Sequence, residues 1–256
     1  MSTKIIKNQI CLITGGAGRI GSSFSKAIVK NSGKVIIGDI DIDRGMSLQE
    51  ELGAENSLFI ELDTSNIQST REALELGKNE FGRIDSAVHC AYPTSSGWGR
   101  PLEEIEPIHL KQDLFSQLGG AILFSQQIIE FFRAQGHGNL VHISSIQGVS
   151  SPKFEHYEGT NMGSPIEYTA IKSGIISITK YLSKYCKRDN IRVNAISPGG
   201  INSNQPQAFI KKYRESCNSK GILDGDDICG ALIFLLSEDS SFIHGQNIIV
   251  DDGWSL

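Results

Sequence analysis

Tyr168 and Lys172 stand four residues apart at the start of a stretch with helical periodicity. Residues four apart on a helix share a face, so the Lys172 ammonium can lie against the Tyr168 phenol. A phenol has an unperturbed pKa of ~10, and a close cation favours its ionised form. The pair could therefore move a proton, although a surface Tyr and Lys beside a core-facing stripe would show the same spacing. The stripe that indicates the amphipathic helix consists of Ile171, Ile175, Ile178, Leu182 and Tyr185.

Composition excludes several classes of function. A net charge of −5 without any basic run predicts neither a nucleic-acid partner nor binding to an anionic membrane. The five cysteines are scattered and lack the paired spacing of a zinc site, which indicates a reducing compartment and no metal centre. No apolar run has the length of a signal peptide or of a membrane span, which is ~20 residues. We therefore expect a cytoplasmic protein that acts on a small molecule.

Short apolar runs alternate with helical patterns along the chain. This alternation predicts one α/β domain over residues 1–256, with a doubly wound parallel sheet and helices on both faces. The expected strands are 10–13, 35–38, 57–62, 84–91, 140–143, 191–196 and 247–250. The longer expected helices are 41–52, 65–81, 114–132 and the one that begins at Tyr168.

The turn after the first expected strand is rich in glycine. Gly16-x-Gly18-x-x-Gly21 fits the dinucleotide fingerprint, and Asp39 follows at the offset of the acid that binds ribose. Such glycines let backbone N–H groups and a helix N-terminus reach a pyrophosphate. Asp39 would accept both adenosine ribose hydroxyls and repel a 2′-phosphate, which favours NAD. Arg19 could hold that phosphate, so NADP stays open, as does a glycine turn that binds nothing.

Several candidate functional residues directly follow the expected strands. In open α/β sheets ligands bind beyond the carboxyl ends of the strands, so these positions share one edge. Tyr168 begins the helix after the fifth strand and overhangs the same edge. The residues that follow strands directly are Gly16, Asp39, Asp63, Ala91, Ser145 and Pro198.

On these motifs the chain resembles the short-chain dehydrogenase/reductase family over almost its full length. The resemblance implies a Rossmann-type sheet of about seven strands in the order 3-2-1-4-5-6-7, and an NAD(P)-dependent oxidoreductase. The matching segments are Thr14-Gly15-Gly16-Ala17-Gly18-Arg19-Ile20-Gly21, Asp63-Thr64, Ser144-Ser145, Tyr168-x-x-x-Lys172 and Asn194-Ala195-Ile196-Ser197-Pro198-Gly199.

The resemblance also implies a role for each matching residue. Tyr168 would be the general acid/base, Ser145 would stabilise charge on the reacting oxygen, and Lys172 would hold the nicotinamide ribose and lower the Tyr168 pKa. Asp63 would meet the adenine, and the backbone after Pro198 would meet the carboxamide. The full set of implied cofactor contacts is Gly15, Gly16, Gly18, Arg19, Ile20, Gly21, Asp39, Asp63, Thr64, Ala91, Tyr168, Lys172, Pro198, Gly199 and Ile201.

The chain departs from the usual family pattern at several places. The glycine turn has the spacing of longer members that act on nucleotide-sugars, and His89-Cys90-Ala91-Tyr92 replaces the usual Asn-Asn-Ala-Gly. Gln117 aligns with the Asn that holds a proton-relay water. The segment between Ser145 and Tyr168 is about ten residues longer than usual and would cover the site. Its Tyr157 is followed four places on by Asn161 rather than lysine, which favours Tyr168 as the acid/base.

Some shorter motifs are similar to those of oxidoreductases from bacterial flagellin-modification loci, which help to make nonulosonic sugars. They are Met162–Tyr168, Ala91-Tyr92-Pro93 and Asp251-Asp252-Gly253-Trp254. The resulting hypothesis is an enzyme that interconverts a hydroxyl and a carbonyl on a small, sugar-derived substrate, as a homodimer or homotetramer. A nucleotide-sugar epimerase or dehydratase and a non-catalytic nucleotide-binding subunit remain as alternatives.

Overall fold

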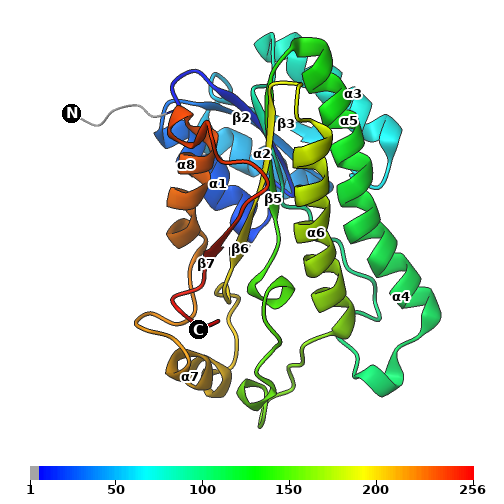
Figure 1. Ribbon diagram of the computed structural model, residues 1–256, viewed down its shortest axis with the longest axis vertical. Coiled ribbons are helices and arrows are strands. Elements are labelled where there is room, and N and C mark those ends of the chain that lie inside the picture. Colours follow the sequence, from blue (N-terminus) through cyan, green and yellow to red (C-terminus); the bar gives the residue numbers. More distant parts are fainter. Residues whose placement is uncertain (1–5) are drawn as a thin grey trace.

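A seven-stranded parallel sheet in the order β3-β2-β1-β4-β5-β6-β7 forms the centre of the computed structural model, which describes residues 6–256 (Figure 1). The order and direction of the strands are those expected from the sequence, so the predicted fold class is confirmed. β4 is shorter than expected at both ends. The strands are β1 (Ile10–Thr14), β2 (Lys34–Asp39), β3 (Ser57–Glu61), β4 (Ser86–His89), β5 (Gly138–Ile143), β6 (Ile191–Pro198) and β7 (Asn247–Val250).

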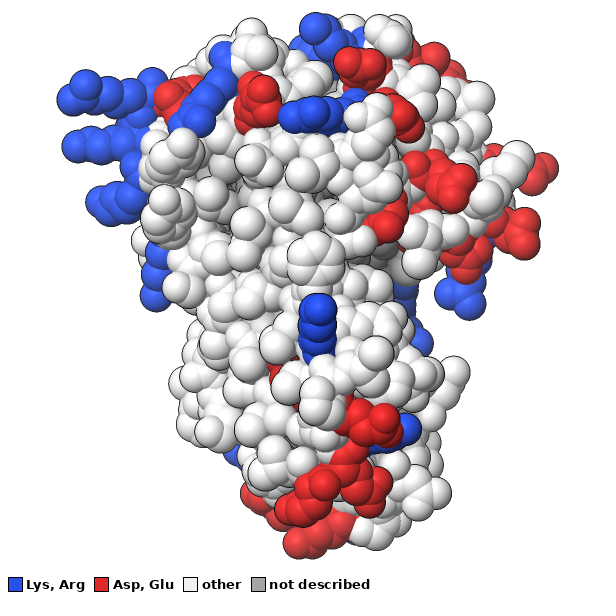
Figure 2. Space-filling view, turned by 90° about the vertical axis from the view of Figure 1, so that its right-hand side faces the viewer, with Lys and Arg blue, Asp and Glu red and all other residues white. Residues whose placement is uncertain are grey.

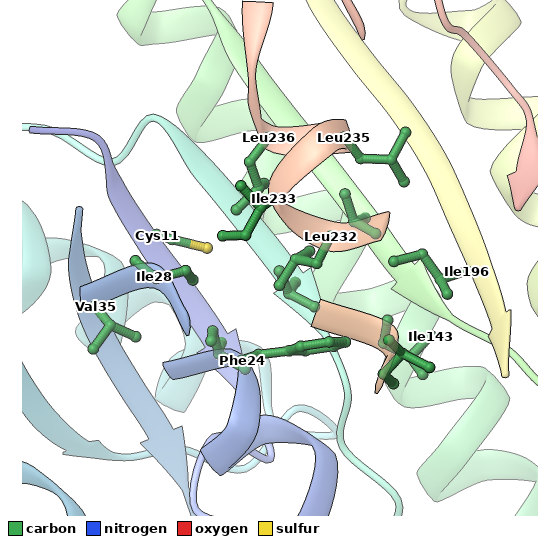
Figure 3. Packing of buried hydrophobic residues seen from close by; sticks show 14 of the residues in the cluster. Cys11, Phe24, Ile28, Val35, Ile143, Ile196, Leu232, Ile233, Leu235 and Leu236 are labelled. Atoms are coloured by element: carbon green, nitrogen blue, oxygen red, sulfur yellow. The ribbon is translucent and has the colours of Figure 1, made fainter. Parts of the chain in front are cut away.

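Helices cover both faces of the sheet, because alternate residues of each buried strand point to opposite sides. In β1, Cys11 and Ile13 join one apolar cluster, while Ile10 and Leu12 join the other. The first cluster lies under α1 (Arg19–Lys30), α2 (Ile42–Leu52) and α8 (Cys229–Leu236). The second lies under α3 (Ile67–Phe81) and α5 (Gly120–Gln135). Figure 3 shows Phe24 of α1 and Leu232 of α8 meeting over the strands of the first cluster.

The helix expected over 114–132 begins earlier and is not uniform. It starts as α4 (Pro107–Asp113), continues through the π-helical segment η2 (Leu114–Gly119) and runs on as α5. Single π turns inside helices often occur at functional sites. Here the π turn contains Gln117, which the sequence singled out as a site residue.

The long segment before Tyr168 lies at the carboxyl edge of the sheet. Residues 146–165 contain only the short 3₁₀ turns η3 (Ile146–Gly148) and η4 (Phe154–His156), and then α6 (Ile166–Tyr185) begins. At the lower end of Figure 1 this segment lies near α7 (Gln207–Glu215) and the C-terminus. None of the helices described, all within residues 6–256, is both long and apolar enough to cross a membrane.

Candidate active site

Tyr168, Lys172 and Ser145 meet at the carboxyl edge of the sheet. The first two turns of α6 carry Tyr168 and Lys172, and Ser145 follows directly after β5. The Lys172 ammonium nitrogen lies 5.6 Å from the centre of the Tyr168 ring and donates a hydrogen bond to the carbonyl oxygen of Ile143 at 3.1 Å. One strand and one helix thus bring Ser145 to the Tyr168–Lys172 pair.

The electrostatics of this group differ from the sequence-based expectation. Burial raises the pKa of Tyr168 above its ordinary value, and a hydrogen bond with Ser145 opposes that shift. Burial also lowers the pKa of Lys172 to about 8. The expected lowering of the Tyr168 pKa is therefore wrong for the protein alone. The Lys172 ammonium faces the ring and a backbone carbonyl, and burial of the phenol is the largest effect on the Tyr168 pKa.

Ser144 fixes the position of α6 relative to β5. Its hydroxyl donates a hydrogen bond to the carbonyl oxygen of Lys172 at 2.7 Å, and its side chain is buried. Helix carbonyls in the interior already accept bonds from within the helix, so this is an additional bond from the sheet. Sequence analysis gave Ser144 only as part of a motif, and no periodicity or spacing indicated this contact.

Gln117 is placed by the π turn with its side chain 2% exposed. Neither its amide nitrogen nor its amide oxygen has a hydrogen-bond partner within the described residues. Buried polar groups are almost always satisfied, so an amide with two free ends indicates a bound water or ligand.

The glycine turn leaves room for a bound phosphate group. α1 has Gly18 as its N-cap, with no side-chain hydrogen bond at that position and no acidic residue in the first turn. Gly15 has a φ of +64°, and a Cβ on Gly21 would come within 2.1 Å of the Gly15 carbonyl oxygen. The turn is therefore compact, and the first N–H groups of α1 are open to an anion.

Asp39 lies directly beside this turn at the end of β2. One carboxylate oxygen accepts a hydrogen bond from the Ala17 backbone at 2.9 Å, and the other accepts one from the Asp41 backbone at 3.1 Å. Arg19 is exposed at the start of α1 and Ile20 follows it. The negative charge of Asp39 thus stands next to the open helix N-terminus, where a dinucleotide would place its adenosine ribose.

The other expected cofactor residues lie along the same edge. Asp63 is exposed and accepts hydrogen bonds from Ser65, while Thr64 is buried against the start of α5. The Ala91 backbone donates to the Thr14 hydroxyl at 3.3 Å, which holds it beside Gly15. Pro198 ends β6, the Gly199 backbone N–H after it donates to the Val250 carbonyl oxygen at 2.9 Å, and Ile201 forms a bridge with Leu223. They all lie at or just beyond the carboxyl ends of the strands.

His89 is the first residue of the segment that replaces the usual Asn-Asn-Ala-Gly. Its ring nitrogen Nδ1 lies 3.0 Å from the Thr14 hydroxyl, and its ring stacks on Phe124. Burial holds the pKa of His89 well below its ordinary value, so the imidazole is neutral. His89 is thus a hydrogen-bonded strand-end residue, as its position suggested, and it ties β4 to β1.

An aromatic wall formed by Tyr92 and Trp98 stands against Tyr168. Both rings meet the Tyr168 ring edge to face, with centroids 5.7 Å and 6.1 Å away, and the Lys172 ammonium lies 5.3 Å from the Tyr92 ring centre. The sequence analysis named Tyr92 only within short motifs and did not name Trp98. The sequence signal that could have indicated this wall is the pair of aromatic residues in a glycine-rich loop.

Comparison with known proteins identifies the family. A family profile described as enoyl-(acyl carrier protein) reductase matches residues 15–255, nearly the whole chain. The chain belongs to the short-chain dehydrogenase/reductase family. The resemblance seen in the sequence is therefore confirmed, and the protein is an oxidoreductase of this family.

Two similar proteins and one similar solved structure cover nearly all of this short-chain dehydrogenase/reductase. Post-translational flagellin modification protein A of Campylobacter coli is 41% identical, covering 98% of this chain and 100% of that protein. The 7alpha-hydroxysteroid dehydrogenase of Bacteroides fragilis is 29% identical, covering 98% and 95%. A short-chain dehydrogenase of Leptospira borgpetersenii, solved with bound NAD⁺, has a TM-score of 0.86 at 29% identity, covering 99% and 95%.

Proposed function

We propose that residues 1–256 act as one NAD(P)-dependent domain that interconverts a hydroxyl and a carbonyl on a small, polar, sugar-derived substrate. The observation that carries the proposal is the meeting of Ser145, Tyr168 and Lys172 at the edge where the glycine turn opens. The similarity to a flagellin modification protein supports a role in the modification of flagellin, through synthesis of a nonulosonic sugar. The five free thiols support a cytoplasmic setting.

Each residue of the site has a distinct task in this proposal. When bound, the nicotinamide ring accepts or gives the hydride. Tyr168 takes the proton from the substrate hydroxyl in oxidation and returns it in reduction, while Ser145 donates a hydrogen bond to the same oxygen. Lys172 would hold the nicotinamide ribose hydroxyls through its ammonium group. Gln117 holds a water with its free amide, and that water supplies and removes protons.

The aromatic wall supports a ring-shaped polar substrate. Tyr92 and Trp98 present ring edges and faces next to Tyr168, and a sugar has apolar C–H faces between its hydroxyls. A ligand site of this kind combines apolar walls with a few polar groups that set orientation. The polar groups here are Ser145 and Tyr168.

The experiment that tests this function is nicotinamide absorbance with purified protein. NAD and NADP would be offered in turn with hexose phosphates, amino sugars and nucleotide-sugars. Net formation of NADH with one of these substrates would support the proposal. An epimerase or dehydratase would convert a nucleotide-sugar with no net NADH, and a binding subunit would bind the cofactor with no turnover at all.

For the cofactor we propose a preference for NAD, because the Asp39 carboxylate stands where a 2′-phosphate would lie. Asp39→Asn removes the charge and keeps an acceptor for the Ala17 backbone. We expect the ratio of kcat/KM with NAD to that with NADP to fall by ~100-fold, since like-charge contacts cost several kcal/mol. Steady-state kinetics with both nucleotides would measure the ratio. An unchanged ratio would mean that Asp39 serves only to hold the turn.

We further propose that the protein forms a dimer through α4, η2 and α5. Figure 2 shows this side of the molecule with a broad area that carries few charges. Ile108, Phe115 and Ile122 are 69%, 57% and 48% exposed. A single exposed apolar residue is common on a protein surface, whereas several in one area indicate an interaction site. A second copy of the chain would cover the area by a two-fold interface. A groove within it is lined by Pro107, Leu110, Lys111, Leu114, Phe115, Leu118, Gly119 and Ile122.

Ile122→Asp is expected to shift the protein from dimer or tetramer toward monomer. A carboxylate in the centre of an apolar interface would lose its solvation on association, which costs several kcal/mol. Light scattering after size exclusion, at micromolar protein, measures the mass. Leu76→Asp, on the exposed side of α3, is the matched control and should leave the mass unchanged. A monomeric wild-type protein would contradict the proposal.

A further inference from the structure

The segment 146–165 carries a second phenol, Tyr157, that is linked to the reacting group. The Gln147 backbone donates a hydrogen bond to the Ser145 hydroxyl at 3.2 Å, and the Gln147 amide nitrogen donates to the Tyr157 hydroxyl at 3.2 Å. The Ser164 hydroxyl donates to the Gln147 amide oxygen at 2.6 Å. Gln147 thus contacts Ser145 through its backbone and Tyr157 through its side chain. Both partners fix the Gln147 amide, so the Tyr157 oxygen has a defined place.

The segment is held firmly by what lies beneath it. The Tyr157 ring packs on Phe209 of α7, with centroids 5.1 Å apart. The His156 ring is buried, and its Nε2 lies 2.9 Å from the Ser216 hydroxyl. The Lys212 ammonium donates to the carbonyl oxygens of Glu155 and Glu158 at 2.8 Å and 3.3 Å. α7 therefore supports the segment from one side.

The C-terminal residues support it from another side. The Lys153 ammonium donates to the carbonyl oxygen of Trp254 at 2.9 Å and lies 4.8 Å from the centre of its ring. Trp254 is buried and stacks on Tyr213 of α7. The position of Tyr157 is thus defined by three parts of the chain. A residue that only covered the site would not need such definition.

The Tyr157 hydroxyl still has a proton to donate. It already accepts from Gln147, and a phenol can donate one hydrogen bond as well as accept. Within residues 6–256 its other polar neighbour is the Ser164 hydroxyl, which donates its own proton to Gln147, so the phenol proton is directed either at the Ser164 oxygen or at a ligand oxygen that replaces it. Tyr157 also lies near enough to Tyr168 for its charge to affect the pKa of that phenol, and burial raises the pKa of Tyr157 itself. The Tyr157 phenol is therefore protonated at neutral pH.

We propose that Tyr157 is a specificity residue that donates a hydrogen bond to a second, non-reacting oxygen of the substrate. This inference rests on the proposed function and narrows its substrate class to molecules with at least two oxygens on one ring or short chain. Ser145 and Tyr168 would hold the reacting oxygen, and Tyr157 the other. Gln147 acts as a positioning residue because it fixes the Tyr157 hydroxyl and contacts Ser145.

The test compares cyclohexanol with the 1,2-, 1,3- and 1,4-cyclohexanediols as substrates, with NAD. We expect at least one diol to be oxidised with a higher kcat/KM than cyclohexanol. In Tyr157→Phe the ratio of kcat/KM for that diol to kcat/KM for cyclohexanol should fall about tenfold, as for the loss of one hydrogen bond. Gln147→Leu should lower the same ratio. Tyr185→Phe, an exposed phenol on the far end of α6, is the matched control.

Binding of the same four alcohols is followed in parallel by protein fluorescence, because Trp98 lies in the site. A ratio that stays unchanged in Tyr157→Phe, or an absence of any preference for a diol in binding, overturns the inference. If wild-type protein prefers a diol in binding and Tyr157→Phe loses that preference, but neither these alcohols nor the sugar panel above are oxidised, the proposed oxidoreductase function fails while the role of Tyr157 stands. A purely structural role for Tyr157 would lower the thermal stability without changing the ratio.

Discussion

Tyr168→Phe is expected to lower kcat for oxidation of the substrate by ~10²–10⁴, the usual contribution of a positioned acid/base. The change removes one oxygen and keeps the ring that packs against Tyr92 and Trp98. Binding of NAD should therefore be retained. Kinetics by nicotinamide absorbance, together with a titration of cofactor binding, measures both quantities.

Tyr157→Phe provides the comparison that separates the two phenols. Tyr157 has no lysine four residues later, whereas Tyr168 has Lys172 on the same helix face. We expect Tyr168→Phe to affect every substrate equally and Tyr157→Phe to affect substrates according to their oxygens. A Tyr168→Phe protein with near-normal kcat would remove Tyr168 from the role of acid/base.

Much of the fold followed from local patterns in the sequence. The strands are short, continuous apolar runs because both faces of a parallel sheet are buried, and β7 has the expected bounds. Capping residues are local signals of the same kind: Asp41 begins α2 by accepting a hydrogen bond from the Arg44 backbone N–H, and Gly53 ends it with a φ of +84°. Such signals depend on neighbours in the chain, and so the sequence contains them.

The site was predictable to the extent that it depends on strand ends. Residues directly after strands share an edge whatever the details of packing, so Ser145 and Asp39 could be placed on that edge. The pKa of Tyr168 could not be predicted in the same way. It depends on how much protein surrounds the phenol and on where the Lys172 ammonium points, and both are set by contacts distant in sequence. The π turn at Gln117 was equally hidden, because its sequence reads as ordinary helix.

Lys172→Met is expected to reduce kcat for oxidation by ~10²–10⁴, because the variant loses the cation that assists the acid/base. Oxidation requires the Tyr168 phenol to lose its proton, so its rate rises with pH through the pKa of that group. Burial already raises this pKa in the protein alone. Without the ammonium we expect the midpoint of the pH–rate profile to move upward by roughly one to three pH units. An unchanged midpoint would show that Lys172 serves only to bind the ribose.

Protein stability distinguishes this effect from damage to the fold. The pKa of Lys172 falls from 10.5 in the unfolded chain to about 8 in the folded protein, because the ammonium is buried. Between these values the unfolded chain holds a proton that the folded protein has lost, so this residue makes wild-type stability rise with pH. Lys172→Met lacks the titration and should be at least as stable as wild type at pH 7, since no buried charge remains.

As pH rises from 8 to 10.5, the unfolding free energy of wild type should increase relative to that of Lys172→Met by a few kcal/mol. This magnitude follows from ~1.36 kcal/mol for each unit by which the pKa differs between the folded and unfolded states. Urea unfolding of the cofactor-free proteins at several pH values measures it. A constant difference would mean that Lys172 is not buried as described. A stable Lys172→Met protein whose pH–rate profile is shifted upward would instead show that Lys172 acts on the proton transfer. The buried charge of Lys172 would then serve catalysis, because the fold alone does not require it.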